Sequence, residues 1–498
     1  MSGWPSIPRR LLLSLAGVGA GLAANPMPGY ARTESRAARS ATPQSTIWTE
    51  FFKGQRIWAY ADRHSVRPGD RLNIMAAGGP GQPLRRARLE VFRVAAPAPI
   101  LVWTSPFAEI SYRAATASAS AIGPGWPPTF PDIDTSAWPP GCYFADIVEQ
   151  ITATRDVKAA CWIVVNPKRS GAVLIRLGTN TYQAYNPWGG HSLYPSDDDE
   201  KRGLIVSFDR PCEPTFFEYD AYLVNWIEAL APGLGGVDYA SNFDVHADPT
   251  ILDRYPLVIT GSHDEYWSGE EFEAFHRRIF KLGRNVAFLG ANTAYCQVRY
   301  GDLNRAPGGP DLGRQLVCYK TSSDPIAGRA GKLDPRRLTT NLFRTDGRRP
   351  ETMLLGAAFQ NWFEGASPRR PAFKVVRTDL PFFAGTGWKV GDVAADVMGY
   401  EWDNRDPDGD GKRLWAAGQS LDPAIDPGRV TVLFRGEAVG DDGERGVAEA
   451  TLFKSPAGAQ VFNAGSVRWV WGLGKEGFVN PAFQRFNANL LRSLSQRA

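Results

Sequence analysis

Tyr255-Pro-Leu-Val-Ile-Thr-Gly-Ser-His-Asp-Glu-Tyr-Trp-Ser268 is the stretch of sequence on which the fold assignment depends. Its apolar first part predicts a short buried strand, and polar side chains follow directly after the strand ends. Open α/β sheets bind their ligands at the carboxyl ends of their strands. Because four functional side-chain types occupy consecutive positions from His263 to Tyr266, we expect a site here as well as a connection.

The segments around this stretch alternate between strands and helices. Ser268 with Glu271 three positions later forms a capping-box pattern, which predicts a helix over 270–282. Continuous apolar runs at 172–177 and 285–289 predict further strands, and helical spacing at 217–230 predicts another helix. Such alternation is typical of a parallel sheet covered on both faces. We therefore predict a doubly wound α/β domain over 168–498, and its scaffold resembles that of the class I glutamine amidotransferases.

The N-terminal third of the chain has a different pattern. Short alternating runs separated by turn residues extend from Thr46 to about Pro167, which favours an immunoglobulin-like β-sandwich over 46–167. A β-rich excursion is expected around 322–440 within the second domain. The last strand, near 460–464, and a final amphipathic helix over 481–494 are expected to return to the α/β sheet.

Composition limits the classes of function. A chain of 498 residues is too long for one ordinary core, so two or three domains are expected. The net charge of +4 is small and the basic residues are scattered, which argues against a nucleic-acid partner. The five cysteines lie far apart without a CxxC pair, so the sequence contains no pattern for a structural zinc site.

The N-terminus indicates export. Arg9-Arg10 precede an apolar run, Leu11 to Ala24, that is too short to span a bilayer. The pattern is similar to a twin-arginine signal, although Pro8 leaves general secretion and an uncleaved anchor as alternatives. We expect residues 1–45 to be a signal and a processed or disordered lead-in. The mature protein would then be periplasmic or secreted, with no stable membrane span.

A possible nucleophile position follows the strand at 285–289. Gly290 to Gln297 has the strand-turn-helix pattern of a nucleophile elbow, but the elbow residue is Asn292, which is not a nucleophile. Cys296 is expected one turn into the helix, pointing into packing, so the thiol mechanism of glutamine amidotransferases is disfavoured. Asn292 is expected to polarise a carbonyl, to orient a water, or simply to occupy a left-handed turn.

Without a protein nucleophile, hydrolysis needs an activated water, and a metal ion is the usual means. The candidate ligands are oxygens: Glu265, Asp264, Tyr143 and the tyrosines of the segment 181–194. A phenol has an ordinary pKa near 10, so phenolate ligands imply a strongly Lewis-acidic hard ion, for which ferric iron is the natural choice. Hydrogen-bonded core tyrosines are the commoner alternative.

Several motifs resemble one known family. They are His263-Asp-Glu-Tyr-Trp-Ser268, Phe288-Leu-Gly-Ala-Asn-Thr-Ala-Tyr295, Tyr182-Gln-Ala-Tyr-Asn-Pro-Trp-Gly-Gly190 and Val461-Phe-Asn-Ala-Gly465. Together they are similar to the C-terminal domain of the N,N-dimethylformamidase large subunit family, over roughly Lys168 to the C-terminus. The resemblance implies hydrolysis of a small amide by a mononuclear ferric ion, held by two tyrosines and one glutamate.

The resemblance also implies roles for individual residues. The metal ligands would be Glu265, Tyr185 with Tyr182 as its rival, and Tyr143 from the sandwich, so that the site would form between the domains. The groups around the substrate would be His263, Asn292 and Glu401.

Two departures from the family leave the substrate open: Cys296 stands where a Trp is usual, and export is unusual for an enzyme of this kind. The leading hypothesis is thus an iron-dependent amide hydrolase, and a monomer and a homo-oligomer are both open as its assembly. The alternatives are a non-catalytic exported protein that binds carbohydrate or peptide, and a thiol enzyme that uses Cys296.

Overall fold

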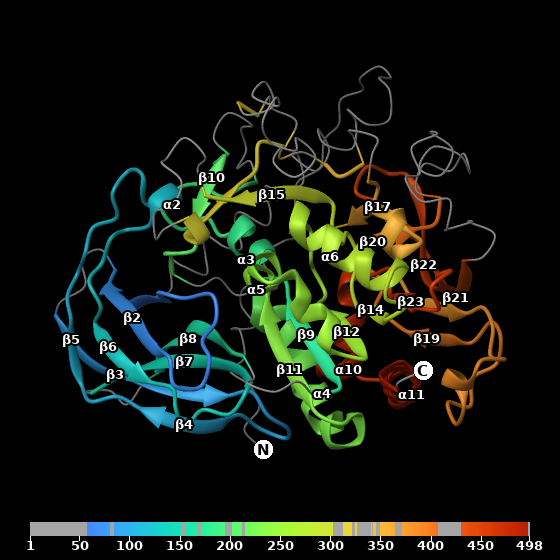
Figure 1. Ribbon diagram of the computed structural model, residues 1–498, viewed down its shortest axis with the longest axis horizontal. Helices are drawn as coiled ribbons and strands as arrows, with labels where there is room; N and C mark the ends of the chain where they lie inside the picture. Colours follow the sequence, from blue (N-terminus) through green and yellow to red (C-terminus); the bar gives the residue numbers. More distant parts are fainter. Residues whose placement is uncertain are drawn as a thin grey trace.

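The computed structural model describes most of the chain as a mixed α/β structure with several sheets (Figure 1). The described residues are 57–79, 84–150, 155–166, 171–194, 202–211, 215–301, 312–320, 324–325, 340, 342–344, 349–363, 371–406 and 430–496. The predicted export signal and lead-in lie outside these ranges. Among the described helices, none combines the length and apolar character needed to cross a membrane.

The N-terminal region is built from two antiparallel sheets, as its alternating runs predict. The first contains β1 (Ile57–Ala61), β2 (Arg71–Gly78) and β6 (Phe130–Asp134). The second contains β4 (Ile100–Thr104), β3 (Arg85–Arg93), β7 (Gly141–Glu149) and β8 (Arg155–Val165), with β5 (Ala108–Ile110) paired to β3. Every residue of β7 is buried, which places this strand inside the molecule. The immunoglobulin type of this region stays a prediction.

A nine-stranded sheet forms the centre of the molecule. Five of its strands are parallel: β11 (Val237–Ser241), β9 (Val173–Leu177), β12 (Leu257–Thr260), β14 (Asn285–Phe288) and β23 (Gln460–Asn463). Numbered along the chain, they have the spatial order 2-1-3-4-5, which is one of the two common doubly wound orders. The order reverses between β9 and β12, so this is where a ligand site is expected.

The same sheet continues with antiparallel strands, β22 (Arg445–Lys454), β21 (Thr431–Val439), β18 (Phe373–Val375) and β19 (Val393–Ala395). The predicted return of the last strand to the α/β sheet is confirmed, because β23 pairs with β14 on one side and β22 on the other. The specific amidotransferase-like assignment stays a prediction.

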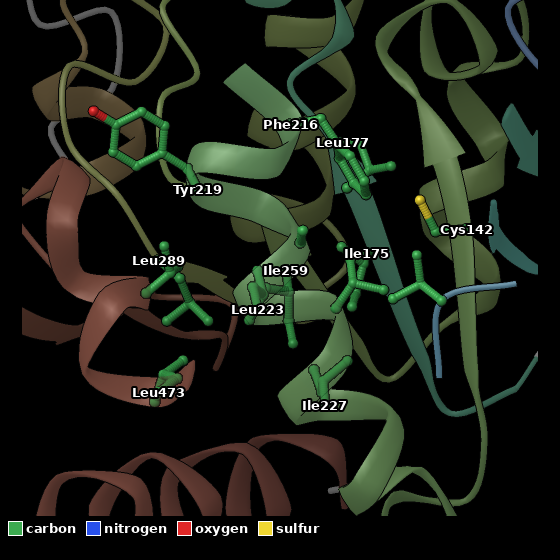
Figure 2. Close-up of a cluster of buried hydrophobic side chains, with 14 of the residues drawn as sticks. Cys142, Ile175, Leu177, Phe216, Tyr219, Leu223, Ile227, Ile259, Leu289 and Leu473 are labelled. Carbon is green, nitrogen blue, oxygen red and sulfur yellow. The ribbon is translucent and has the colours of Figure 1, made fainter. Parts of the chain in front are cut away.

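Successive side chains along the parallel strands point to opposite faces of the sheet, and this explains why helices cover both faces. Ile175 and Ile259 point toward α4 (Ala221–Leu234) and α11 (Pro481–Ser495), whereas Leu174 and Val258 lie in a second core with α5 (Asn242–Ala247) and α6 (Gly269–Phe280). Figure 2 shows Ile175, Leu223 and Leu473 in the first of these cores, with Cys142 of β7 nearby. The N-terminal sheets and the α/β sheet therefore share one hydrophobic core.

The remaining elements surround the carboxyl ends of the parallel strands. They are α3 (Thr179–Tyr185), the sheet β10 (Ile205–Ser207), β16 (Gln315–Val317), β15 (Cys296–Tyr300) and β13 (Tyr266–Ser268), and the pair β17 (Ala358–Phe363) and β20 (Tyr400–Asn404). Short helical segments complete the described structure: α2 (Ala119–Ile122), η3 (Phe216–Asp220), η4 (Pro249–Arg254), η5 (Leu312–Arg314), α8 (Thr352–Leu355), η7 (Pro381–Phe383), η9 (Val467–Val470) and α10 (Trp471–Gly474).

Capping side chains fix where helices α6 and α11 begin. The Ser268 side chain accepts a hydrogen bond from the backbone N–H of Glu271 at 3.2 Å, which confirms the predicted cap of α6. Asn480 caps α11 in the same way through the backbone N–H groups of Ala482 and Phe483.

The nucleophile-elbow prediction was wrong. After β14 the chain turns through Asn292 and Ala294, which have φ angles of 52° and 56°, and then enters strand β15 instead of a helix. Cys296 pairs beside Tyr266 in a parallel ladder, and this pairing holds the segment extended. The first part of the segment 181–194 belongs to helix α3.

Gly290 lies where the turns after β12 and β14 come closest together. A Cβ atom at this position would lie 1.8 Å from the carbonyl oxygen of Ser262, so any side chain forces the two turns apart. We expect Gly290→Ala to lower the free energy of unfolding by about 3 kcal/mol or more. The matched control is Gly233→Ala in α4, where the added Cβ would lie 4.0 Å from Nε of Arg492 and helix propensity favours Ala. Thermal unfolding of both variants tests this, and equal melting temperatures would contradict it.

Candidate active site

A buried arginine holds the segment that follows β12. Arg176, at the carboxyl end of β9, makes two contacts of 2.5 Å with the carboxylate of Asp264 and an ion pair of 2.8 Å with Glu271 of α6. All three side chains are 0% exposed. The guanidinium also lies 4.6 Å from the ring centroid of Trp267. Asp264, a candidate ligand in the sequence, is thus engaged by Arg176, and together with Trp267 it orients the residues between and beside them.

Two tyrosines converge on one oxygen of Glu265. The hydroxyl groups of Tyr185 and Tyr194 donate to Oε2 of Glu265 at 2.9 Å and 2.6 Å. Their rings stack with centroids 4.1 Å apart, and the ammonium group of Lys320 lies 3.6 Å from the centroid of the Tyr194 ring. Thr181 of α3 fixes the backbone of Glu265 by accepting its N–H at 3.0 Å. Three hard oxygen atoms therefore meet at one buried point.

Burial and charge keep these phenols protonated. Burial raises the pKa of Tyr185 well above its ordinary value, and the negative charge of Glu265 raises it further. The same two causes raise the pKa of Tyr194. The hydroxyl of the neighbouring Tyr266 is buried and has no hydrogen-bond partner among the described residues. Deprotonation of either stacked phenol therefore requires a compensating positive charge.

A histidine and a second carboxylate lie beside the tyrosines. Nε2 of His263 lies 2.9 Å from Oε2 of Glu401, and Nδ1 lies 2.8 Å from the hydroxyl of Tyr400. The ring of His263 is also within 3.7 Å of Glu265 and 3.5 Å of the Tyr185 hydroxyl. Burial alone would lower the pKa of His263, but Glu401 and then Glu265 outweigh it and raise the pKa. A proton shared between His263 and Glu401 is stabilised at this position.

Asn292 connects the turn after β14 to the same carboxylate. Its Nδ2 donates to Oε2 of Glu401 at 3.2 Å, while its backbone N–H donates to Asp403 at 2.8 Å. Asn292 occupies the left-handed turn that was one of its expected roles, and its expected action on a carbonyl or a water stays a prediction. Strand β20 supplies both Glu401 and Asp403, because it crosses the ends of β14 and β23, where Asn463 donates to Asp403 at 3.0 Å.

Cys296 lies against the site but lacks the properties of a nucleophile. Its thiol is buried on β15, 3.5 Å from Oε1 of Glu265. Burial raises its pKa well above the ordinary value, and a nucleophilic cysteine requires the opposite shift. The structure therefore gives no support to the thiol mechanism, in agreement with the sequence.

The structure places the tyrosines that the sequence offered as alternative metal ligands in different surroundings. Tyr185 is in the cluster, whereas the hydroxyl of Tyr182 donates to Asp220 beneath it. Tyr143 is not brought to the cluster: its hydroxyl donates to the carbonyl oxygen of Pro139, and its ring stacks on Trp138 within the N-terminal sheets. The second phenol beside Glu265 is Tyr194, so the cluster forms within the α/β region and not between the domains.

Sequence reasoning named Tyr194 only as one of the tyrosines of the segment 181–194, because its spacing of nine residues from Tyr185 gave no reason to pair the two. Two other residues of the site, Tyr400 and Arg176, were missed. Tyr400 directly precedes Glu401 and was visible as its neighbour. Arg176 was the one charge inside an apolar strand, and such a charge must find a partner when buried.

The arrangement fits a hard cation. Among the described residues no three His, Cys, Asp or Glu side chains come together as a metal-binding group, so any metal site here depends on the phenols. Two phenol oxygens and a carboxylate oxygen form such a donor set, and a strongly Lewis-acidic ion could replace the two phenol protons. The residues present are therefore suited to the ferric ion that the motifs implied.

Fold and site together define a doubly wound α/β protein with a buried tyrosine, carboxylate and histidine cluster at the topological switch point. The chain belongs to the family described as N,N-dimethylformamidase beta subunit-like, C-terminal, whose model matches residues 88–482. The match begins within the N-terminal sheets, well before the region that the motifs covered. No curated protein matches the chain.

Asp403 makes a testable contribution to the pH dependence of stability. Burial raises its pKa to about 7, against the opposing hydrogen bonds from Asn292 and Asn463. An unfolded aspartate has a pKa near 4, so the folded chain binds this proton more tightly, and stability falls as pH rises from about 4 to about 7. The effect is at most about 4 kcal/mol, from about 1.4 kcal/mol per pKa unit.

We expect Asp403→Asn to lose less stability than the wild type between pH 5 and pH 8. The amide carries no titrating proton, and Asn463 can present its Oδ1, which has no partner among the described residues. Melting temperatures of both proteins across this pH range provide the measurement. If the melting temperatures of both proteins changed equally with pH, Asp403 would not be the cause of the pH dependence of stability.

Proposed function

We propose that this protein is a hydrolase of carbon-nitrogen bonds in small amides and that it uses a ferric ion. The observation that carries the proposal is the convergence of the Tyr185 and Tyr194 hydroxyls on Glu265, with His263 and Glu401 beside them. Membership in a family named for N,N-dimethylformamidase supports the reaction type. The position of the cluster at the switch point of the sheet supports a ligand site.

The residues proposed to hold the ion are Tyr185, Tyr194 and Glu265. When bound, a ferric ion supplies Lewis acidity that activates a water molecule or an amide carbonyl. Two acidic side chains, Glu265 and Glu401, face a single imidazole here, and this concentration of negative charge favours binding of a cation. Tyr194 replaces Tyr143 as the second phenol of the proposal.

The proton-transfer groups of the proposal are His263 and Glu401. Their contact of 2.9 Å allows one proton to move between Nε2 and the carboxylate. Tyr400 holds the imidazole from the opposite side at Nδ1, which fixes the ring plane. Amide hydrolysis requires a proton to be removed from water and delivered to the departing amine, and this pair can perform both transfers.

The alternative of a non-catalytic binding protein has less support. It rested on three features of the sequence: the number of tryptophans, the β-sandwich and the export signal. In the part of the chain that the structure describes, every tryptophan whose side chain is placed is buried or half-buried. These tryptophans therefore pack in or against the cores, and among them no exposed indole surface argues for such a ligand.

Assembly and location form part of the proposal. The matching family is described as beta subunit-like, which favours a chain that associates with further subunits or with copies of itself. Export to the periplasm or the medium is proposed from the paired arginines and the apolar run that follows them.

Removal of the proposed carboxylate ligand should abolish both metal content and activity. We expect purified wild-type protein to contain stoichiometric iron, and Glu265→Gln to lose it together with at least ~100-fold of amide hydrolysis, because even supporting groups of metal sites contribute 10- to 100-fold. The control Glu437→Gln changes an exposed residue of β21 and should retain both. Elemental analysis and amine release provide the two measurements. A folded wild-type protein without iron would refute the proposal.

The phenols give the ion a spectroscopic signature. We expect a visible phenolate-to-iron charge-transfer band that Tyr194→Phe weakens or shifts, because one of the two phenol donors is lost. Tyr143→Phe and Tyr182→Phe serve as matched controls and should leave the band unchanged, since their hydroxyls bind Pro139 and Asp220. If Tyr143→Phe removed the band and Tyr194→Phe did not, the ligand set would be the one first inferred from the motifs.

A further inference from the structure

Two free thiols lie together at the edge of the site. Cys296 belongs to β15 and Cys318 directly follows β16, and both are 0% exposed in the hydrophobic cluster that contains Tyr185. Sγ of Cys296 lies 3.5 Å from Oε1 of Glu265, and Sγ of Cys318 lies 3.7 Å from the carbonyl oxygen of Gln297, the next residue after Cys296. The proposed amide hydrolysis uses neither thiol.

Strand pairing places both thiols on one face of the sheet. β15 and β16 are antiparallel, with Arg299 opposite Val317. One step further along the same register, Cys318 lies opposite Val298, and Cys296 is two residues before Val298 on β15. Opposite residues share a face of the sheet, and so do residues two apart on one strand. The two cysteines are therefore diagonal neighbours across the strand pair.

The surroundings make Cys318 the more reactive of the two thiols. Burial raises the pKa of Cys318, but a hydrogen bond from the Cys296 thiol and the positive charge of Lys320 outweigh burial and lower this pKa. Burial and the same hydrogen bond raise the pKa of Cys296. Because the thiolate is the reactive form of a cysteine, an oxidant is expected to react first with Cys318.

We propose that Cys296 and Cys318 form a reversible disulfide when a peroxide reaches the site, and that this bond lowers amide hydrolysis. Sγ of Cys318 attacks one oxygen of hydrogen peroxide, the O–O bond breaks, one water leaves, and a sulfenic acid remains. Sγ of Cys296 then attacks that sulfur, the S–O bond breaks, and a second water leaves as the S–S bond forms. Two thiols together lose two electrons, one peroxide gains them, and both thiol protons leave in the waters.

Access to the thiols, and the effect of the bond, rest on the proposed function. A site that admits water and an amide to Glu265 also admits hydrogen peroxide to Cys296, because the sulfur lies 3.5 Å from the carboxylate. In the disulfide, Cys296 has no S–H to donate to Oε1 of Glu265, and its sulfur is turned toward Cys318. Glu265 then loses a contact that orients it, and groups that orient metal ligands contribute about 10- to 100-fold to metal affinity or activity.

The diagonal placement favours a disulfide that is easily reduced. Cα atoms of diagonal neighbours lie about 7–8 Å apart, whereas disulfides usually join Cα atoms about 4.4–6.8 Å apart. The bond therefore draws β15 and the end of β16 together and is formed under strain. Strained disulfides are the ones that thiols reduce readily, which suits a reversible modification.

Peptide mapping of the wild-type protein tests the modification itself. Purified protein is treated with hydrogen peroxide, catalase removes the excess, and the free thiols are alkylated before digestion. We expect a linked peptide pair that joins Cys296 to Cys318, and recovery of both thiols after dithiothreitol. Cys142 is the internal control, because it is equally buried, burial raises its pKa, and it has no thiol partner among the described residues. Its oxidation should be at least ~10-fold slower.

Amide hydrolysis before and after the same treatment tests the effect on the site. In wild-type protein we expect kcat/KM to fall by about 10-fold on oxidation and to return with dithiothreitol. Cys318→Ala keeps the thiol beside Glu265 and removes its partner, so this variant should hydrolyse amides normally and resist peroxide. Cys142→Ala is the matched control and should remain as sensitive to peroxide as the wild type.

Each outcome decides a separate point. If the peptide map of wild-type protein, which depends on no variant, showed no link between Cys296 and Cys318, the inference would be wrong. A link with unchanged kcat/KM, or equal inactivation of Cys318→Ala, would overturn the effect on hydrolysis. If reduced, folded and iron-loaded protein hydrolysed no amide, the proposed function would fall, while the peptide map would still decide whether the disulfide forms.

Discussion

The ion-pair network of Arg176 with Asp264 and Glu271 is the interaction on which the rest of the site depends. All three side chains are fully buried, and the network joins strand β9, the segment after β12 and the first turn of α6. Removal of one member of a buried ion pair costs about 3–5 kcal/mol, because the other charge is left uncompensated. His263 and Glu265 flank Asp264 directly, so their positions follow from the fixed carboxylate between them.

The strand order brings the other residues of the site to the residues that this ion-pair network holds. β9 and β12 pair up to their carboxyl ends, and the helices that follow them, α4 and α6, cover different faces of the sheet. At this switch point Tyr185 from α3 faces Glu265. Strand β20 then closes the arrangement by bringing Tyr400 and Glu401 across the ends of β14 and β23. The N-terminal sheets share a hydrophobic core with this region, but their Tyr143 is engaged with Pro139.

Stability and function make opposite demands at this cluster. Burial raises the pKa of both stacked phenols, and unpaired polar atoms remain on Asn292, Trp362 and Tyr266 among the described residues. Such groups lower stability unless a ligand satisfies them, whereas the surrounding cores are apolar and well packed.

By itself, the sequence determined the elements with strong local signals: the short parallel strands, the helix capped by Ser268, the final helix, and the placement of His263 and Glu265 after a strand. Apolar periodicity and capping act over a few residues, so they can be read without knowledge of the fold. Only the tertiary structure decided that Tyr194 and not Tyr143 lies beside Glu265, that Cys296 lies on a strand, and that Tyr400 holds His263. These contacts join residues far apart in the chain, and they depend on which strands are neighbours and on which face each side chain lies.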